Sequence, residues 1–345
     1  MSFKIENTEV GNSRTFIIAE VAQAHDGSLG TAHAYIDAAS KTGVDAIKFQ
    51  THIASAESSI DEPWRVKFSR QDETRFDYWK RMEFSREQWL GLKEHAESRG
   101  LVFLSSPFSN EAVDLLEDLG ISAWKIASGE VSNPLLLKHI AKTGKPVILS
   151  TGLSTYDELD LACSIFTSMD CPIAILQCTS SYPTPASEVG LNVMQELSDR
   201  YSCPAGLSDH TASIYTGIAA ATLGASLLEV HITLSKDSFG PDVPASLTTE
   251  ELAQLVAGIR HVETLLANPM DKAAQQSGFD EMNQIFRKSL YLAEDLKEGQ
   301  ELLEEHLVAK KPGTGIPAAN YKSVLGKKLV RTMSKGEKLS LDDLD

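Results

Sequence analysis

Hydrophobic and polar positions alternate in a regular way along residues 15–266. Short runs of apolar and β-branched residues are each followed by a longer segment with amphipathic spacing, which is the pattern of repeated βα units. Several of the expected helices end at a glycine suited to a left-handed C-cap, at Gly43, Gly100, Gly120 and Gly144. The expected strands of the successive units lie at 15–20, 45–50, 101–106, 123–128, 146–150, 173–178, 204–208 and 226–232.

Eight consecutive βα units over about 250 residues match the size and count of a (β/α)8 TIM barrel. A doubly wound parallel sheet is the alternative that the same alternation allows. The polar residues favour the barrel, because they follow the apolar part of nearly every strand, at the end that forms the carboxyl face of a barrel. These strand-end residues are Glu20, Lys48, Gln50, Ser105, Ser106, Lys125, Ser128, Glu130, Ser150, Tyr182, Ser208, His210, Glu229 and His231.

The rest of the chain predicts a second, smaller domain. A long insertion, residues 51–86, follows the second strand, and long βα loops at that face commonly cover a site. Residues 267–286 lack strand signals and are expected to form a linker. Short strand-like runs at 288–294 and 327–333, separated by glycine and proline turns, indicate a β-rich unit. The predicted organisation is therefore a barrel over 1–266, a linker over 267–286 and a small domain over 287–345.

Composition and charge restrict the class of protein. Hydrophobic residues make up 42% of the 345 residues and charged residues 23%, which is typical of a globular protein. The net charge of −16 disfavours nucleic acid and anionic membrane surfaces as partners. The chain shows neither a secretory leader nor a stretch of about 18 apolar residues. We expect a cytoplasmic protein with no membrane partner.

Two lysines occupy otherwise apolar strands, Lys48 in DAIKFQ and Lys125 in AWKIAS. A buried ammonium group requires an anionic partner, because an unpaired charge is costly to remove from water. Internal ion pairs with glutamates are one interpretation, and Glu20, Glu130 and Glu229 are the candidates. The other is a bound phosphate or carboxylate, assisted by the hydroxyl groups of Ser128, Ser150 and Ser208.

His210 and His231 end consecutive strands, which are neighbours about 5 Å apart in a barrel. Two imidazoles that meet at one point favour a divalent cation, and the room left for oxygen ligands suits Mn or Mg as a Lewis acid. His25, in the loop after the first strand, either reaches this site or makes a turn contact. Asp242, in a Gly-Pro-Asp turn, is either a turn residue or a ligand for a polyol.

Taken in order, several segments resemble the sialic acid synthase family: FIIAEVAQAHDGSLG, DAIKFQTH, SSPFS, AWKIASGE, PVILSTG, SYPTP, GLSDHT, LEVHIT and GPD. Residues 287–331 are similar to the antifreeze-like (SAF) domain that this family carries after its barrel. The resemblance implies condensation of phosphoenolpyruvate with the open-chain aldehyde of an N-acyl hexosamine, such as N-acetylmannosamine. Phosphate would be released, and the product would be a nine-carbon 2-keto sugar acid.

The resemblance also implies roles for particular residues. Glu20 and Glu229 would stabilise or deprotonate reacting groups, and His210 and His231 would hold the metal ion. Ser105 is expected to bind substrate at its strand end. The residues that would bind phosphoenolpyruvate are Lys48, Gln50, Lys125, Ser128, Ser150 and Ser208, and those that would bind the sugar are Glu130, Tyr182 and Asp242.

In the family, the small domain caps the partner's barrel in a domain-swapped homodimer, and an arginine before Pro-Gly reaches the acylamino group of the sugar. Lys311 stands at that position here, and lysine keeps the charge but lacks the planar fork of arginine. Ser180 replaces an asparagine of the family, and Gln23 and Ala24 also differ. These departures fall on the sugar side, so the identity of the aldehyde stays open.

Two other functions are compatible with parts of this sequence. A synthase that joins phosphoenolpyruvate to an aldose phosphate would share the barrel, but such enzymes lack the C-terminal antifreeze-like domain. A non-catalytic sugar- or ice-binding protein built around the small domain would not explain polar residues at the ends of strands throughout the barrel.

Overall fold

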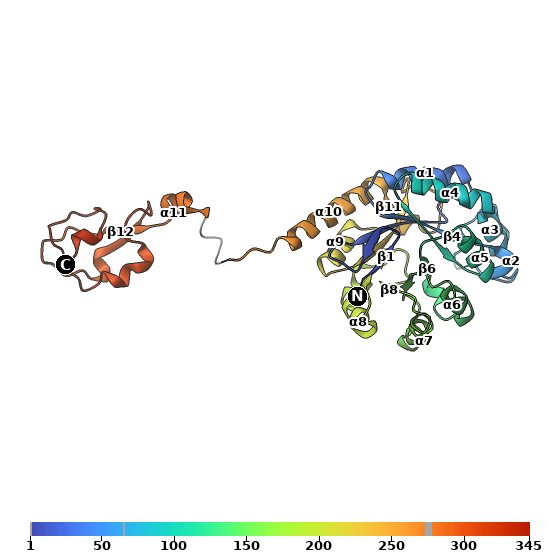
Figure 1. Ribbon diagram of the computed structural model, residues 1–345. Helices are drawn as coiled ribbons and strands as arrows, with labels where there is room; N and C mark the ends of the chain where they lie inside the picture. Colours follow the sequence, from blue (N-terminus) through green and yellow to red (C-terminus); the bar gives the residue numbers. More distant parts are fainter. Residues whose placement is uncertain (1, 65, 273–277) are drawn as a thin grey trace. The chain divides into compact units, whose positions relative to one another are not determined.

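The computed structural model describes residues 2–64, 66–272 and 278–345. These residues divide into two compact units, one that ends at Asn268 and one that begins at Pro269 (Figure 1). Part of the predicted linker, residues 273–277, lies outside the described residues. The remainder of that segment contains a short helix, α11 (Asp280–Phe286).

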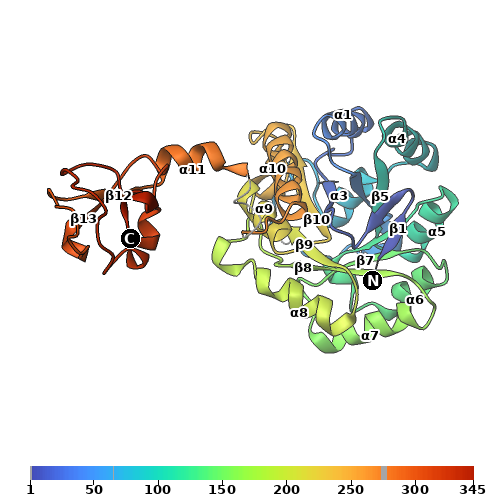
Figure 2. The ribbon, with the colours of Figure 1, turned by 60° about the vertical axis from the view of Figure 1, so that its left-hand side comes forward.

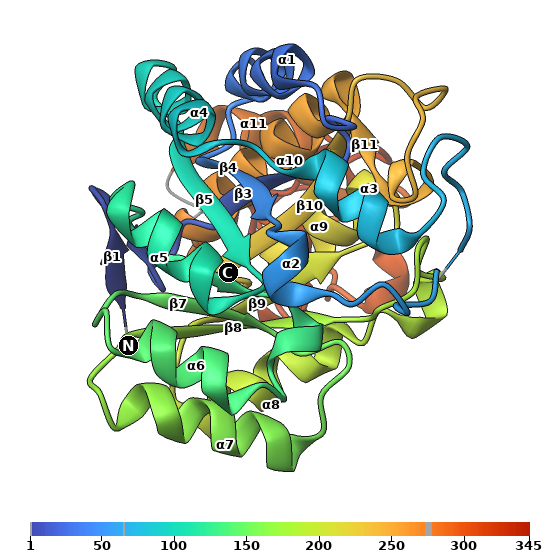
Figure 3. The ribbon, with the colours of Figure 1, turned by 90° about the vertical axis from the view of Figure 1, so that its right-hand side faces the viewer.

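The first unit is a closed parallel barrel, as predicted. Strand β10 pairs with both β3 and β9, and this pairing closes the sheet and excludes the doubly wound alternative. The helices surround the strands (Figure 2 and Figure 3). The barrel strands are β3 (Phe16–Ala22), β4 (Ala46–Thr51), β5 (Val102–Pro107), β6 (Trp124–Ile126), β7 (Val147–Ser150), β8 (Ile173–Cys178), β9 (Ala205–Asp209) and β10 (Leu227–Thr233).

Local sequence signals set the ends of the outer helices. Ser85, Thr155 and Thr248 each cap a helix N-terminus through a capping box. The four predicted glycine C-caps are confirmed, because each of these glycines has a positive φ. The helices are α1 (Leu29–Ser40), α4 (Arg86–Ser98), α5 (Asn110–Asp118), α6 (Pro134–Ala141), α7 (Tyr156–Thr167), α8 (Leu191–Tyr201), α9 (Ile214–Thr222) and α10 (Thr249–Ala267), and the short strand β11 (Leu247–Thr248) precedes α10.

Alternation along the strands separates two hydrophobic layers. Ile17, Ile47 and Phe103 point outward and pack in the layer beneath the helices. Inward-facing residues one position away form a second cluster inside the barrel, which consists of Phe16, Ile18, Ala46, Val102, Leu104, Ala123, Ile148, Ala174, Leu176 and Leu227. Because side chains alternate with a period of two, the next inward positions toward the carboxyl ends are the polar residues of the predicted site.

A hairpin that the sequence pattern did not predict precedes the barrel. Strands β1 (Phe3–Ile5) and β2 (Thr8–Val10) pair in antiparallel fashion. Ile5 and Val10 are fully buried and belong to the inner barrel cluster. Three-residue strands are too short to show a periodicity, but the hairpin supplies apolar side chains that close the amino-terminal end of the barrel.

The second unit is small and β-rich, as predicted. Strand β12 (Ser289–Leu292) pairs with β13 (Leu307–Lys310), and a separate hydrophobic cluster that includes Leu292, Leu302 and Val324 forms its core. The predicted strand-like run at 327–333 instead makes isolated bridges, such as that between Leu296 and Met333. In the part of the chain that the structure describes, no helix has the length and apolar character needed to cross a bilayer.

Candidate active site

Two lysines and two glutamates form a charged cluster inside the barrel, and all four residues are at most 4% exposed. Lys48 Nζ lies 2.7 Å from a carboxylate oxygen of Glu20 and 3.8 Å from one of Glu229. Lys125 Nζ lies 3.2 Å from the other carboxylate oxygen of Glu229. The structure therefore contains internal ion pairs with Glu20 and Glu229, the first of the two interpretations, and Glu229 is shared by both lysines. Glu130, the third candidate, lines the cavity instead.

The ionisation of this cluster follows from burial and from the neighbouring charges. Burial opposes the charge on Glu229, but Lys125 and Lys48 outweigh it and lower the pKa of Glu229 to about 2. Burial lowers the pKa of Lys125, whereas for Lys48 the attraction of Glu20 and Glu229 exceeds the effect of burial and raises the pKa. The ionised carboxylate of Glu229 thus lies between the two lysine side chains inside the barrel.

Hydroxyl groups surround the two ammonium groups. Lys48 Nζ donates to Ser106 Oγ at 3.3 Å, and Lys125 Nζ donates to Ser150 Oγ at 2.7 Å. Ser208 Oγ donates to Glu229 at 3.2 Å. The structure does not bring Ser105 into this cluster, because Ser105 shares the outward face of β5 with Phe103. Its hydroxyl donates to the carbonyl oxygen of Phe49 at 3.2 Å.

The two predicted metal ligands lie side by side. The ring centroids of His210 and His231 are 5.2 Å apart, and both residues are buried. His210 Nδ1 donates to the carbonyl oxygen of Thr179 at 3.0 Å, which leaves Nε2 with a free lone pair. Burial, followed by repulsion from His231, lowers the pKa of His210 to about 3 and keeps its ring neutral.

This pair of rings fits a divalent cation that completes its shell with oxygen atoms. Neutral imidazole is the form that binds a metal, and His210 presents it at neutral pH. Among the described residues, no group of three or more His, Cys, Asp or Glu side chains is placed to enclose an ion. Two protein ligands leave positions for water or substrate, whereas a closed structural zinc site would need four.

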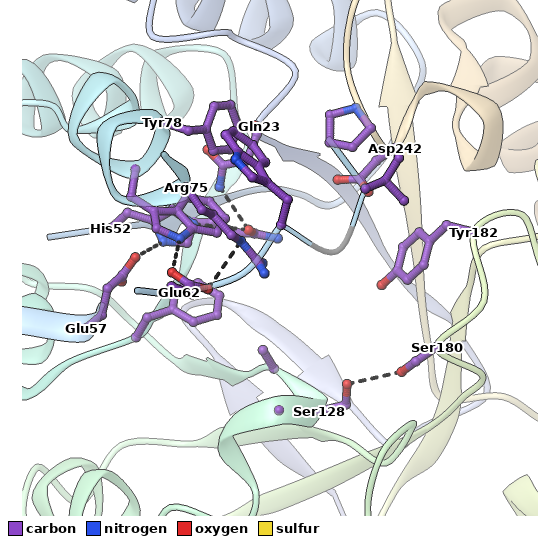
Figure 4. A pocket seen from close by; sticks show the side chains of 18 of the residues that line it. Gln23, His52, Glu57, Glu62, Arg75, Tyr78, Ser128, Ser180, Tyr182 and Asp242 are labelled. Carbon is purple, nitrogen blue, oxygen red and sulfur yellow. Dashed lines mark hydrogen bonds and ion pairs between the residues drawn. The ribbon is translucent and has the colours of Figure 1, made fainter. Parts of the chain in front are cut away.

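A cavity of about 490 Å³ lies at the carboxyl-terminal end of the barrel. Of the predicted site residues, it is lined by Gln50, Ser128, Glu130, Tyr182, His231 and Asp242. Burial raises the pKa of Glu130. Ser128 and Ser180 approach each other at 3.3 Å on this wall, and Tyr182 and Asp242 lie nearby (Figure 4).

Gln50 connects the cavity to the charged cluster below it. Its Nε2 donates to Glu20 at 2.8 Å, and its Oε1 accepts from Gln23 Nε2 at 2.9 Å. The same oxygen lies 3.3 Å from His52 Nε2. Hydrogen bonds of Gln50 therefore link the Glu20 carboxylate to the cavity wall.

The insertion between β4 and α4 forms much of that wall and contains α2 (Ala54–Glu57) and α3 (Arg75–Met82). Arg81 anchors it to the barrel, since its guanidinium group donates to Asp72 at 2.8 Å and to Asp26 at 2.8 Å. Gly27 adopts a φ of +75°, and a Cβ atom there would lie 2.4 Å from the carbonyl oxygen of Arg81. Glycine is thus required where the two loops meet.

Two predicted candidates lie elsewhere. His25 packs against Phe84, with ring centroids 4.8 Å apart, and its Nδ1 accepts from the amide of Gly27 at 3.1 Å. The turn contact is therefore the interpretation that the structure supports. Lys311 belongs to the second unit, where its ammonium group lies 4.9 Å from the centre of the Phe286 ring.

The residues of the insertion that line the cavity were not predicted from the sequence. His52 is stacked between Trp79 and Phe108, with ring centroids 4.1 and 4.5 Å away. Glu57 and Trp64 also line the cavity. The unusual density of aromatic residues between 64 and 79 was the available signal.

A closed barrel whose inward polar residues meet beneath a cavity at the carboxyl end defines a TIM-barrel protein with an active-site architecture. The model of the NeuB family matches residues 35–271, and that of the SAF domain matches residues 287–345. The chain belongs to the NeuB family and carries a C-terminal SAF domain.

Individual relatives agree with this assignment. The chain is 36% identical over 331 residues to the N,N'-diacetyllegionaminic acid synthase of Campylobacter jejuni, which covers 94% of this chain and 98% of the relative. It is 32% identical to the human N-acetylneuraminate-9-phosphate synthase, over 97% of this chain and 94% of the relative. The crystal structure of N-acetylneuraminic acid synthetase from Leptospira borgpetersenii, in complex with citrate, superposes with a TM-score of 0.72 at 30% identity and covers 82% of this chain and 96% of that one.

Proposed function

We propose that the protein condenses phosphoenolpyruvate with the open-chain aldehyde of an N-acyl hexosamine and releases phosphate and a nine-carbon 2-keto sugar acid. The observation that carries this proposal is the pair of buried lysines, Lys48 and Lys125, set among serine hydroxyls beneath the cavity. Phosphoenolpyruvate bears a phosphate and a carboxylate on the same carbon, C2, and two cations with hydroxyl donors suit both groups.

The ligand would be held by residues from several strands. Lys48, Lys125 and Ser150 would bind its anionic groups, with Ser128 and Ser208 beside them. In this structure Glu20 and Glu229 are paired with the ammonium groups of the two lysines. To bind phosphoenolpyruvate, each lysine must therefore donate to the ligand as well as to a glutamate. Each lysine has three N–H donors, which allows a glutamate and a substrate oxygen to be bound at once.

The reaction forms one carbon–carbon bond and replaces the C2–O bond to phosphate by a C2–O bond to the oxygen of water. The C3 carbon of phosphoenolpyruvate attacks the aldehyde carbon, and the aldehyde oxygen takes up a proton to become a hydroxyl group. Water then adds to the electron-poor C2 carbon, and the C2–O bond to phosphate breaks to leave the keto group. Glu20 and Glu229 are the carboxylates of this cluster that can accept the proton of the attacking water.

His210 and His231 would hold a divalent ion, Mn or Mg. When bound, such an ion supplies positive charge beside the anionic substrate and polarises the carbonyl group of the aldose. Glu130, Tyr182 and Asp242, which line the cavity, would bind the hydroxyl groups of the sugar. For the second unit we propose the domain-swapped arrangement, in which Lys311 of one subunit approaches the sugar in the other.

The proposal is tested by incubating the full chain with phosphoenolpyruvate, Mn and N-acetylmannosamine, measuring phosphate and identifying the keto acid by mass. Folded Lys125→Ala and His231→Ala variants should lose phosphate release, whereas Ser105→Ala, whose hydroxyl faces outward, should keep it. Phosphate release with tetrose or pentose phosphates alone would favour an aldose phosphate synthase. No release with any aldose would overturn the proposal. The domain-swapped arrangement requires a dimer, and the mass measured by analytical ultracentrifugation at low protein concentration tests for it.

A further inference from the structure

We infer that Thr184, in the loop between β8 and α8, is a positioning residue for the pair of histidines: its hydroxyl and amide groups fix the place and the tautomer of the His210 ring. The inference rests on the proposed function, in which His210 and His231 hold the divalent ion. Thr184 belongs to the SYPTP segment, in which Tyr182 is the residue proposed to bind the sugar.

The side chain of Thr184 attaches this loop to the barrel. Thr184 is 6% exposed, whereas the prolines on either side of it, Pro183 and Pro185, are exposed. A buried hydroxyl group requires a hydrogen-bond partner. Thr184 Oγ1 lies 2.7 Å from the carbonyl oxygen of Ser181 and 3.2 Å from that of Thr179. Its hydroxyl hydrogen is therefore shared between two carbonyl groups of the loop.

One of these carbonyl groups also binds His210. The Thr179 carbonyl oxygen accepts from His210 Nδ1 at 3.0 Å, and its second lone pair can accept from Thr184. The backbone amide of Thr184 donates to the carbonyl oxygen of His210 at 2.9 Å. Thr184 thus holds both the main chain of His210 and the acceptor of its ring.

The Thr179 carbonyl group decides which nitrogen of His210 is available to a cation. A neutral imidazole carries one proton, and the hydrogen bond made by one nitrogen sets the state of the other. With the proton on Nδ1, Nε2 keeps its lone pair. If the Thr179 carbonyl group moved away, the proton would be free to occupy Nε2 and block it. Loss of such a partner typically weakens metal binding about 10- to 100-fold.

The same loop places an aromatic ring against both imidazoles. The ring centroid of Tyr182 lies 4.1 Å from that of His210 and 5.8 Å from that of His231, to which it is edge-on. Tyr182 lines the cavity and comes two residues before Thr184 (Figure 4). A loop released at Thr184 would therefore also change the packing around the two imidazole rings.

The test uses the metal-free full chain and measures two quantities. Nitrogen NMR of the histidine rings at neutral pH shows which nitrogen of His210 is protonated, and His210→Asn assigns its signals. Calorimetric titration gives the affinity for Mn. Thr184→Val replaces the hydroxyl group by a methyl group of similar size, and Thr184→Ser keeps the hydroxyl group. The matched control is Ser181→Ala, which removes a hydroxyl group of the same loop that donates to the Pro183 carbonyl oxygen at 3.1 Å.

We expect the wild type, Thr184→Ser and Ser181→Ala to keep the proton on Nδ1 of His210. Thr184→Val should shift the proton to Nε2 in a measurable fraction of the molecules. It should also weaken Mn binding about threefold to tenfold, which is the range for the loss of one neutral hydrogen bond. Thr184→Ala, which puts no methyl group against the two carbonyl oxygens, should show the same changes and replaces Thr184→Val if that variant does not fold.

The remaining outcomes contradict the inference or separate it from the proposed function. An unchanged protonation of His210 in Thr184→Val and Thr184→Ala overturns it, and so does a Thr184→Ser variant that behaves like Thr184→Val. Equal Mn affinity of the wild type and Thr184→Val also overturns it. If the wild type takes up no Mn, the proposed metal site fails, and the NMR measurement, which contains no metal, still decides whether Thr184 positions the His210 ring.

Discussion

Ser105 and Ser106 are adjacent in β5, yet their hydroxyl groups lie on opposite faces of the barrel wall. Ser106 accepts from Lys48 inside the barrel at 3.3 Å, and Ser105 donates to the carbonyl oxygen of Phe49 in the outer layer at 3.2 Å. The inner face carries the charged cluster and the outer face packs beneath the helices. Two neighbouring residues of one type therefore provide a matched pair of substitutions.

For this pair we expect Ser106→Ala to lower kcat/KM for phosphoenolpyruvate about tenfold, because the Lys48 ammonium group loses a neutral acceptor that helps to orient it. Ser105→Ala should change it by less than about twofold. Initial rates of phosphate release at varied phosphoenolpyruvate concentration give both values. Equal effects of the two substitutions would contradict the assignment of the inner face.

The shared ion pairs of Glu229 predict a stability effect. Lys125→Met should destabilise the barrel by about 3 kcal/mol, because Glu229 would keep only the more distant Lys48 as its cation in this cluster. Adding Glu229→Gln should recover more than half of that loss without restoring activity. Urea unfolding followed by tryptophan fluorescence reports on the barrel unit, since Trp64, Trp79, Trp89 and Trp124 all lie in it. Additive losses in the double variant would argue against the shared pair.

Metal binding can be tested without the reaction. Calorimetric titration with Mn should give one site per chain, and His210→Asn or His231→Asn should weaken it at least about tenfold. His139→Asn is the control, because His139 lies on α6 and pairs with Asp114 at 2.7 Å on the outside of the barrel. Unchanged Mn affinity in both site variants would contradict a metal site at His210 and His231.

The contact between the insertion and the barrel predicts a pH dependence. Hydrogen bonds from Arg81 lower the pKa of Asp72, so its ionised form stabilises the folded state. This contribution is present above the unfolded pKa of about 3.9 and is lost as the pH falls through the lower folded value. Asp72→Asn should cost about 1–2 kcal/mol at pH 7 and progressively less below about pH 4. A cost that does not vary between pH 7 and pH 3 would contradict this account.

The barrel was predictable because the same sequence pattern recurs in each βα unit. Each strand shows an apolar run that ends in a polar residue, and the closing pairs of β10 with β3 and β9 confirm the count. The strand ends also identified Lys48, Lys125, Glu20 and Glu229, since an ionisable residue in an apolar strand requires a partner. Choosing between Ser105 and Ser106 required the register of β5, and a shift of one position reverses the face.

The parts that were not predicted depend on contacts distant in sequence. His52 belongs to the cavity because Trp79 and Phe108 stack on it, and no local spacing indicates that arrangement. His25 has the same residue type and a similar position after a strand, but its turn directs it toward Phe84. Sequence separates such residues poorly, because the direction of a loop side chain is set by tertiary packing.

The N-terminal hairpin affects how water reaches the interior of the barrel. Ile5 and Val10 fill the end of the barrel opposite the ionisable residues with hydrocarbon, whereas the cavity lies at the other end, beside the insertion. If the first ten residues were removed, water could enter the barrel interior through its amino-terminal end. The lysines and glutamates would then meet water from both directions, and their mutual attraction would weaken accordingly.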